Sequence, residues 1–210
     1  MNINKLPKNI SVFSLSDVVF FPKTVLPLNI FEKRYIQLVN DCMKDQRLFG
    51  MIQPKKTGKD QDFYEVGCLG KIINFNETND GRFLINLSGI IRFRIIKELD
   101  SSKLYRKFSV DYSDFLQDLK IEKNNTEYNK QDFLKKIEIF FKKKNYLINI
   151  NELEKQNFEQ LINALCMVSP ISLAEKQKLI ETASNEEKIK LFENIINFNL
   201  ADKFKNKTIQ

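Results

Sequence analysis

The stretch RFLINLSGIIRFRIIKE, residues 82–98, decides the fold class, because apolar and polar side chains alternate along almost all of it. A period of two is typical of a β-strand with one buried face. Every second position carries an apolar residue or glycine: Phe83, Ile85, Leu87, Gly89, Ile91, Phe93 and Ile95. This run would extend about 40 Å at about 3.3 Å per residue, which is too long for one straight strand in a small domain. We therefore expect a bulge or a sharp bend at Gly89.

The neighbouring segments predict that this strand belongs to a small, strongly coiled barrel. Residues 63–75 are strand-like and carry two glycines, and the connection 76–81 ends in Asp-Gly, a strong hairpin signal. Residues 107–112 alternate in the same way. Long strands that bend at glycines favour a barrel over an open sheet.

The first part of the chain adds shorter elements and one helix. Residues 13–21 look like a first strand, and Pro27 restricts the next short segment to a sheet edge or a strand end. Asn29 and Glu32 have the spacing of a capping box. We therefore expect a helix from about Ile30 to Lys44, with Asn29 as its N-cap.

The second part of the chain is predicted to be helical. Residues 117–130 are polar and charged, with Lys-Asn-Asn-Thr at positions 123–126, and they indicate a boundary. Four helical segments follow, and two of them begin with further capping boxes, Ser172–Glu175 and Ser184–Glu187. The predicted organisation has three parts: a β-rich subdomain with one helix over residues 1–118, a linker over 119–130, and a helical subdomain over 131–210.

The composition excludes several classes of enzyme. The 210 residues contain no histidine, which removes Ser-His-Asp and Cys-His catalysis, HExxH zinc sites and every imidazole base. The three cysteines, Cys42, Cys68 and Cys166, are odd in number and far apart, so neither a zinc knuckle nor a disulfide framework is supported. No apolar run is long enough to span a membrane, and the first residues lack a secretory signal. We therefore expect a cytoplasmic protein.

Two patterns that resemble catalytic sites fail on their residue types. Gly58-Lys59 lacks the first glycine and the hydroxyl group of a phosphate-binding loop. Ser101-Ser102-Lys103 contains the parts of a serine–lysine dyad, but in a surface-like turn that neither buries nor positions them. We interpret both as solvated loops and predict no catalytic residue, no metal site and no cofactor.

Two pairs of residues are candidates for binding. Arg92 and Arg94 flank Phe93 on the long strand, so both guanidinium groups are expected on one face. There they would grip a carboxylate, a phosphate or an RNA backbone, or, in the interpretation that we favour, pair with acids on the polar outer face. Phe20 and Phe21 are adjacent in a predicted strand, where neighbours point to opposite sides, so one of the two rings is expected to be exposed.

Taken in order, several segments resemble the N-terminal, substrate-binding domain of Lon proteases. The matching segments are FSLSDVVFFP (13–22), LPLNIFE (26–32), RY (34–35), FGM (49–51), YEVGCLG (64–70), DGR (80–82), GIIRFRI (89–95) and SPISLAEKQKL (169–179). The resemblance covers about residues 10–200. Lys23 and Lys33 depart from it, because a glycine and a proline are common at these positions. The resemblance implies an α+β fold, with a PUA-like β pseudo-barrel followed by an α-helical bundle.

The resemblance also implies a function. It indicates a stand-alone relative without the ATPase and protease domains, and hence a non-catalytic module that binds polypeptide segments or partner proteins in protein quality control. The alternative is an RNA-binding PUA-like protein, which a net charge of +7 would fit, although the lysines are scattered and only six arginines are present. A membrane partner is not expected, and the oligomeric state is not predicted. The expected binding residues are Phe20, Phe21, Phe31, Tyr35, Arg92 and Arg94.

Overall fold

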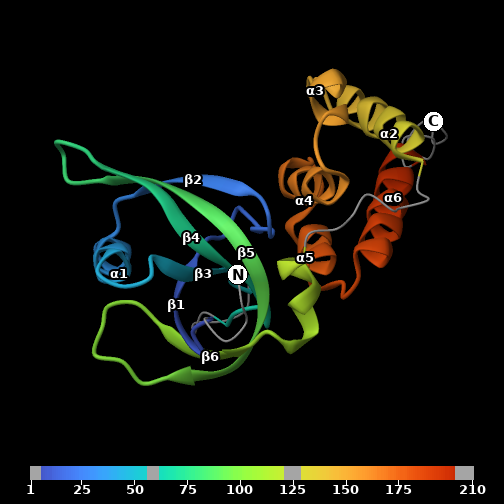
Figure 1. Ribbon diagram of the computed structural model, residues 1–210. Helices are drawn as coiled ribbons and strands as arrows, with labels where there is room; N and C mark the ends of the chain where they lie inside the picture. Colours follow the sequence, from blue (N-terminus) through green and yellow to red (C-terminus); the bar gives the residue numbers. More distant parts are fainter. Residues whose placement is uncertain (1–5, 56–61, 121–128, 202–210) are drawn as a thin grey trace, which may run out of the picture. The chain divides into compact units, whose positions relative to one another are not determined.

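The computed structural model describes residues 6–55, 62–120 and 129–201 (Figure 1). The chain divides into two compact units, residues 1–121 and 122–210. The predicted loop at Gly58-Lys59 and the centre of the predicted boundary, residues 123–126, lie outside the described residues.

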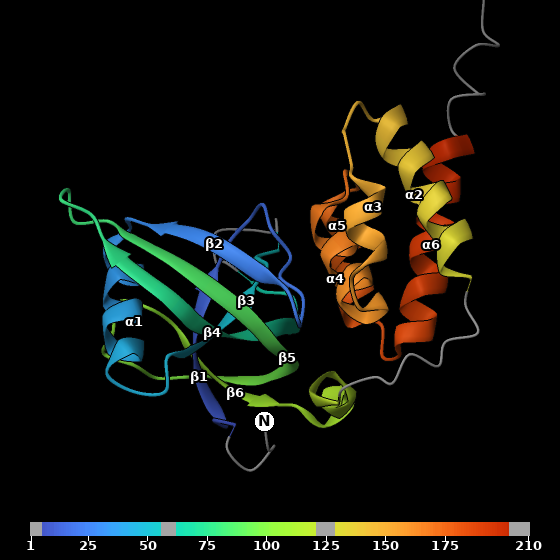
Figure 2. The same cartoon turned by 45° about the horizontal axis from the view of Figure 1, so that its top comes forward.

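The first unit is built around one mixed sheet of six strands (Figure 2). The strands are β1 (Asn9–Ser14), β2 (Val25–Ile30), β3 (Leu48–Ile52), β4 (Val66–Glu77), β5 (Phe83–Leu99) and β6 (Lys107–Asp111). Their order in the sheet is β2-β5-β4-β3-β1-β6, and β6 also pairs with β5. This last pairing closes five of the strands into a barrel, which has no free edge of its own. Among the pairings of the described strands, only that of β1 with β3 is parallel.

The length of β5 explains how the barrel closes. One edge of β5 pairs with β4 from Phe83 to Arg94. The opposite edge pairs first with β2, over Phe83–Ser88, and then with β6, over Arg94–Leu99. The same strand therefore pairs with β2 along its first half and closes the barrel by pairing with β6 along its second half.

The predicted bend lies at Gly89. The register with β4 steps from the pair Leu69 and Ile91 to the pair Gly70 and Gly89, so Ile90 is an extra residue on β5. An extra residue bends a strand and increases its twist. A Cβ atom on Gly89 would lie 2.3 Å from the carbonyl oxygen of Phe21, so only glycine permits this close approach.

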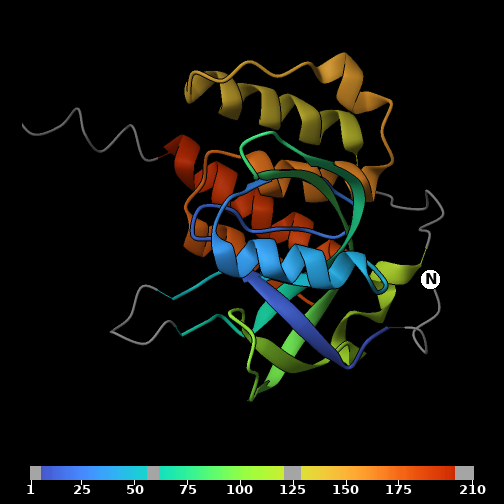
Figure 3. The same cartoon turned by 90° about the vertical axis from the view of Figure 1, so that its left-hand side faces the viewer.

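Two expected elements in the first unit are wrong. Residues 13–21 do not form one strand, because β1 ends at Ser14 and no strand includes residues 15–21. Helix α1 covers Lys33–Met43 rather than residues 30–44, and its N-cap is Glu32, without a side-chain capping bond. Asn29 is not a cap, because it lies in β2 opposite Leu84. Asn29 thus belongs to the sheet, although its spacing from Glu32 is that of a capping box. Figure 3 shows α1 lying against the barrel.

The second unit is helical, and the α+β class is confirmed. Its helices are α2 (Lys130–Lys143), α3 (Ile150–Glu154), α4 (Phe158–Val168), α5 (Leu173–Glu181) and α6 (Asn185–Ala201). The short helix α3 was not predicted. The capping box of Ser172 and Glu175 is present in full, and the hydroxyl group of Ser184 accepts from the Glu187 amide. Phe133, Phe140 and Phe192 are fully buried in this unit. Among the described residues, no helix is long and apolar enough to cross a membrane.

Candidate functional site

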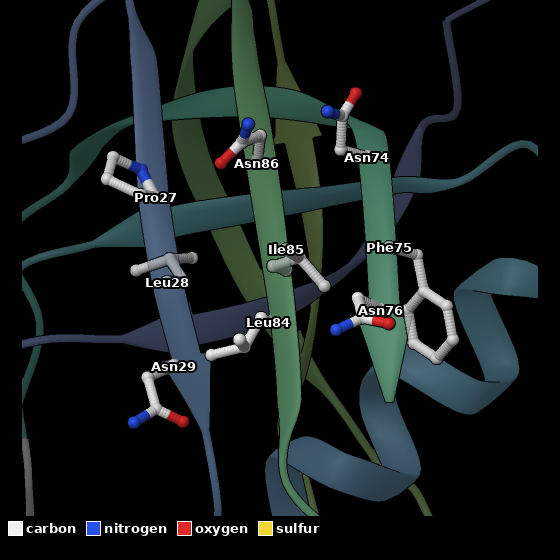
Figure 4. A pocket seen from close by; sticks show the side chains of 9 residues that line it. All are labelled: Pro27, Leu28, Asn29, Asn74, Phe75, Asn76, Leu84, Ile85 and Asn86. Atoms are coloured by element: carbon white, nitrogen blue, oxygen red, sulfur yellow. The ribbon is translucent and has the colours of Figure 1, made fainter. Parts of the chain in front are cut away.

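A shallow groove of about 510 Å³ crosses the three strands at the end of the sheet that β2 forms (Figure 4). Its nine lining residues come in threes from β2, β5 and β4: Pro27, Leu28 and Asn29, then Leu84, Ile85 and Asn86, then Asn74, Phe75 and Asn76. No residue in this set is ionisable, although 29% of the chain is charged. The groove is therefore an uncharged surface on a basic protein.

The strand register arranges the outward-facing members of the groove in two rows. Asn86 lies between Pro27 on β2 and Asn74 on β4. In the next row, Leu84 lies between Asn29 and Asn76. Residues that are directly opposite in a sheet share a face and lie close together. Each row thus combines one apolar side chain with two primary amides.

The side-chain amides of these rows have hydrogen-bonding capacity to spare. None of the four asparagine side chains of the groove forms a hydrogen bond with another side chain or backbone group in the described part of the chain. Each amide group carries two N–H donors and an oxygen acceptor. Leu84 is 43% exposed in the middle of them. A neutral ligand with both apolar and amide groups would match this combination.

The expectation that Phe20 or Phe21 is exposed is wrong. Their side chains are only 2% and 0% exposed. The rule of alternating faces applies within a strand, whereas these residues lie in the irregular segment between β1 and β2. Phe20 packs at Gly70, where an added Cβ atom would lie 2.9 Å from its ring. Both rings are core residues and not a binding patch.

Phe31 and Tyr35, which were expected to lie together on the surface, separate. Phe31 is 67% exposed just before α1, whereas Tyr35 is buried. The Tyr35 ring stacks on Phe13 with centroids 4.0 Å apart, and its hydroxyl group donates to the Ser14 carbonyl over 3.0 Å. These contacts of Tyr35 attach α1 to the end of β1. Of the two side chains, only that of Phe31 is accessible.

Arg92 is not on the polar outer surface, because a short helix covers it. The 3₁₀ helix η2 (Ser113–Leu119) brings Asp118 to Arg92, with Nε–Oδ2 and Nη2–Oδ1 distances of 2.9 and 2.8 Å. The guanidinium group also lies 4.5 Å from the centre of the Phe115 ring. Arg94 is on the same side of β5 and bridges Glu65 and Asp114. Both arginines therefore have a structural role, because their guanidinium groups pair with carboxylates of the same unit.

None of the three cysteine thiols is activated, and the turn Ser101-Ser102-Lys103 does not form a serine–lysine dyad. All three cysteines are buried, and burial raises the pKa of the Cys42 and Cys166 thiols to about 12. Lys103, from the serine-containing turn, pairs with the Asp41 carboxylate over 2.9 Å rather than with a serine. No group of three or more metal-ligating side chains occurs in residues 6–55, 62–120 and 129–201.

Lys188 in the helical unit is buried, which the sequence analysis did not predict. Its Nζ donates to the Asn163 and Asn185 side-chain oxygens over 2.9 and 3.2 Å. The Asn185 amide in turn donates to Glu159 on α4. This polar network joins α4 to the first turn of α6, and its members are too well engaged with each other to form an open site.

The sequence analysis also missed the groove. A signal was present, since Asn74, Asn76 and Asn86 alternate with apolar residues and Pro27 marked an edge. Each pattern by itself indicates only the polar face of a strand. The pairing of β4 with β5 and of β5 with β2 places the four asparagines on one surface.

The chain combines a closed β-barrel with a helical unit, and both lie within a match to one protein family. Residues 9–197 match the family described as ATP-dependent protease La (LON) substrate-binding domain, and the chain belongs to this family. The structure is similar to the Lon N-terminal domain protein of Xanthomonas campestris, with a TM-score of 0.66 and 18% identity, over 89% of this chain and 97% of that one. The N-terminal domain of the Mycobacterium avium complex Lon protease gives a TM-score of 0.66 and 14% identity, over 90% and 98% of the two chains.

Full Lon proteases are similar to this chain over a fraction of their length. The Lon protease of Malacoplasma penetrans is 29% identical over 195 residues, which are 86% of this chain and 24% of that protein. The Lon protease of Desulfosudis oleivorans is 31% identical over 96 residues, or 43% of this chain and 12% of that protein. The chain thus spans a quarter or less of the length of these two relatives.

Proposed function

We propose that this chain is a non-catalytic recognition module that binds uncharged, extended segments of polypeptide in the groove formed by β2, β5 and β4. The observation that carries the proposal is the pairing of exposed apolar groups with unengaged amides on a surface without charge. A polypeptide backbone presents one amide N–H and one carbonyl per residue. A charged ligand would lose hydration there without gaining an ionic partner.

Family membership supports the same conclusion, since the family is described by substrate binding. We further infer that the chain works in the cytoplasm in protein quality control. Three cysteines without a disulfide support a reducing compartment.

RNA binding is the alternative, and the pairing of the arginines argues against it. Five of the six arginines form ion pairs with carboxylates: Arg34, Arg82, Arg92, Arg94 and Arg106. A phosphate backbone is bound by available cations, ideally in a continuous stripe with accessible aromatic rings. Arginines that already pair with carboxylates are less available to bind phosphate. No arginine lines the groove.

Fluorescence anisotropy tests the proposal with two labelled probes, a reduced and alkylated model protein and a single-stranded RNA. We expect the unfolded protein to bind with an affinity that hardly changes with salt. Leu84→Ser, in the centre of the groove, should weaken binding several-fold, since it removes an exposed apolar contact and leaves the core intact. Ile139→Ser is the matched control, because Ile139 is also exposed but lies on α2.

Two binding results would contradict the proposed recognition of polypeptide in the groove. The first is equal loss of binding in the Leu84 and Ile139 variants, which would remove the groove from consideration. The second is RNA binding that falls steeply with salt and is stronger than binding of the unfolded protein, because counterion release would then dominate recognition. Hydrolysis of ATP or peptide that co-purifies quantitatively with the chain would contradict its non-catalytic character.

A further inference from the structure

The outer edge of β2 has backbone groups that no neighbouring strand uses. β2 is the last strand in the sheet order, with β5 on one side only. Figure 4 shows β2 on one side of β5 and β4 on the other. Edges of this kind are templates for a further strand unless a protein blocks them.

The direction of each backbone group follows from the ladder that β2 forms with β5. The Gly89 amide donates to the Thr24 carbonyl and the Gly89 carbonyl accepts from the Lys23 amide, both over 2.9 Å, so Gly89 directs both of its backbone groups to the β2 side. Along β5 this direction recurs at every second residue, at Leu87, Ile85 and Phe83, which lie opposite Leu26, Leu28 and Ile30. Leu26, Leu28 and Ile30 therefore face β5, and the N–H and C=O groups of the residues between them point to the open edge.

The groups at the open edge belong to Val25, Pro27 and Asn29. Pro27 has no N–H, and its place in the alternation is the one where a proline removes no bond to β5. The edge accordingly offers three carbonyl acceptors and two N–H donors. Within the described residues, no backbone hydrogen bond outside the β2–β5 ladder engages any of the five.

We propose that a segment of polypeptide binds as an additional strand along this edge, next to the groove. This inference rests on the proposed function and specifies how the polypeptide is held. Strand addition uses main-chain bonds for affinity and pockets for alternate side chains for specificity. The incoming strand would find exposed Val25 and Pro27 beside it and the amides of the groove beyond them.

The positions of the backbone N–H donors along the β2 edge favour a foreign segment over a second copy of the chain as the added strand. Two β2 edges that pair about a two-fold axis with complete overlap place Pro27 opposite Pro27. Neither proline can donate, so both bonds of the central pair are lost and two carbonyl groups are left without a donor. A foreign strand without proline loses only one of six possible bonds. Its side chains are expected to be uncharged, because the lining of the groove is uncharged.

Amide hydrogen exchange, followed by NMR at single residues, gives the direct test. The probe is a fluorescein-labelled ten-residue peptide of alternating threonine and valine with blocked ends. On binding, the Val25 and Asn29 amides should become protected, while those of Leu26 and Leu28 are already protected by β5. A ligand that lies on the groove without adding a strand would leave the exchange of Val25 and Asn29 unchanged.

Single substitutions change the number of edge donors in both directions. Pro27→Ala restores the missing N–H and should tighten peptide binding by about 2- to 13-fold, the effect of one net hydrogen bond. Asn29→Pro removes an edge N–H and should weaken binding by a similar factor. Asn29→Ala is the control, since it removes the same side chain and keeps the N–H. Melting temperatures of all three variants establish that the fold is intact.

The outcomes separate this inference from the proposed function. Peptide binding without protection of Val25 and Asn29, or with equal affinity in Asn29→Pro and Asn29→Ala, overturns strand addition and leaves groove binding intact. Failure of both the peptide and an unfolded protein to bind overturns the proposed function itself. Protection of both amides that rises with protein concentration in the absence of peptide, with a dimer in sedimentation velocity, would make a second copy the occupant and overturn the choice of a foreign segment.

Discussion

Arg92 of β5 and Asp118 of η2 form a buried ion pair with two parallel hydrogen bonds, across 26 residues of sequence. The Asp118 carboxylate also accepts from the Arg92 backbone amide over 3.0 Å. One carboxylate thereby fixes both the strand and its side chain. The pair holds the segment that follows β6 against the barrel.

This pair predicts a large loss of stability when one partner is removed. Asp118→Asn removes the negative charge that pairs with the buried Arg92, and breaking a buried ion pair in this way costs about 3–5 kcal/mol in the free energy of unfolding. Asp114→Asn is the control, because Asp114 pairs with Arg94 at the surface and should cost at most about 1 kcal/mol. Urea denaturation of both variants measures the difference. Equal and small effects would mean that Asp118 is hydrated in solution.

Gly89 should tolerate no side chain. The added Cβ atom of Gly89→Ala would meet backbone atoms of Phe21 and Pro22 that cannot rotate away, so we expect a cost at or above the upper end of about 1–3 kcal/mol. Gly81→Ala has open space around it but a φ of +79°, and should cost only about 1 kcal/mol. Thermal unfolding of the two variants compares a steric with a conformational penalty. A fully stable Gly89→Ala would contradict the close contact of β5 with the segment before β2.

Replacement by serine should destabilise the protein strongly at Phe21 and hardly at all at Phe31. Phe21→Ser removes a fully buried ring and is expected to cost about 3–5 kcal/mol. Phe31→Ser changes an exposed ring and should stay within about 0.5 kcal/mol. Denaturant titration at equilibrium measures both. A stable Phe21→Ser variant would mean that Phe21 is exposed, in line with the expectation that one of the two adjacent phenylalanine rings lies at the surface.

Asp41 should make stability depend on pH in the acid range. A hydrogen bond from Lys103, and a second one from Tyr105, lower the pKa of its carboxyl group. A lowered pKa in the folded state contributes stability above the ordinary pKa, and this contribution is lost as the pH falls through the folded value. Asp41→Asn should therefore be less stable than the wild type near neutral pH and match it in strong acid. Asp45→Asn is the control for removing one negative charge, and a pH-independent difference for Asp41→Asn would refute this assignment.

The sequence alone determined the strands and helices that have a strong local period. The alternation of residues 82–98 and the Asp80-Gly81 turn predicted β4 and β5, and Ser172 with Glu175 predicted the start of α5. These signals succeed because side-chain direction within a strand and capping within a helix depend on neighbours in sequence. The resemblance of ordered motifs to the Lon substrate-binding domain supplied the family, which the comparison over residues 9–197 confirmed.

Only the tertiary structure decided which faces of these elements are covered. Phe20 and Phe21 are both buried because the chain between β1 and β2 leaves the strand conformation, and Arg92 is buried because η2 returns to cover it. Pro27 could be assigned to an edge from sequence, but the identity of its neighbours depended on the pairing of β2 with β5. The groove combines β2 with lining residues of β4 and β5 that lie about 45–60 positions further along the chain. Local periodicity carries no information about such pairings, because they are selected by the burial of the whole sheet and not by any one segment.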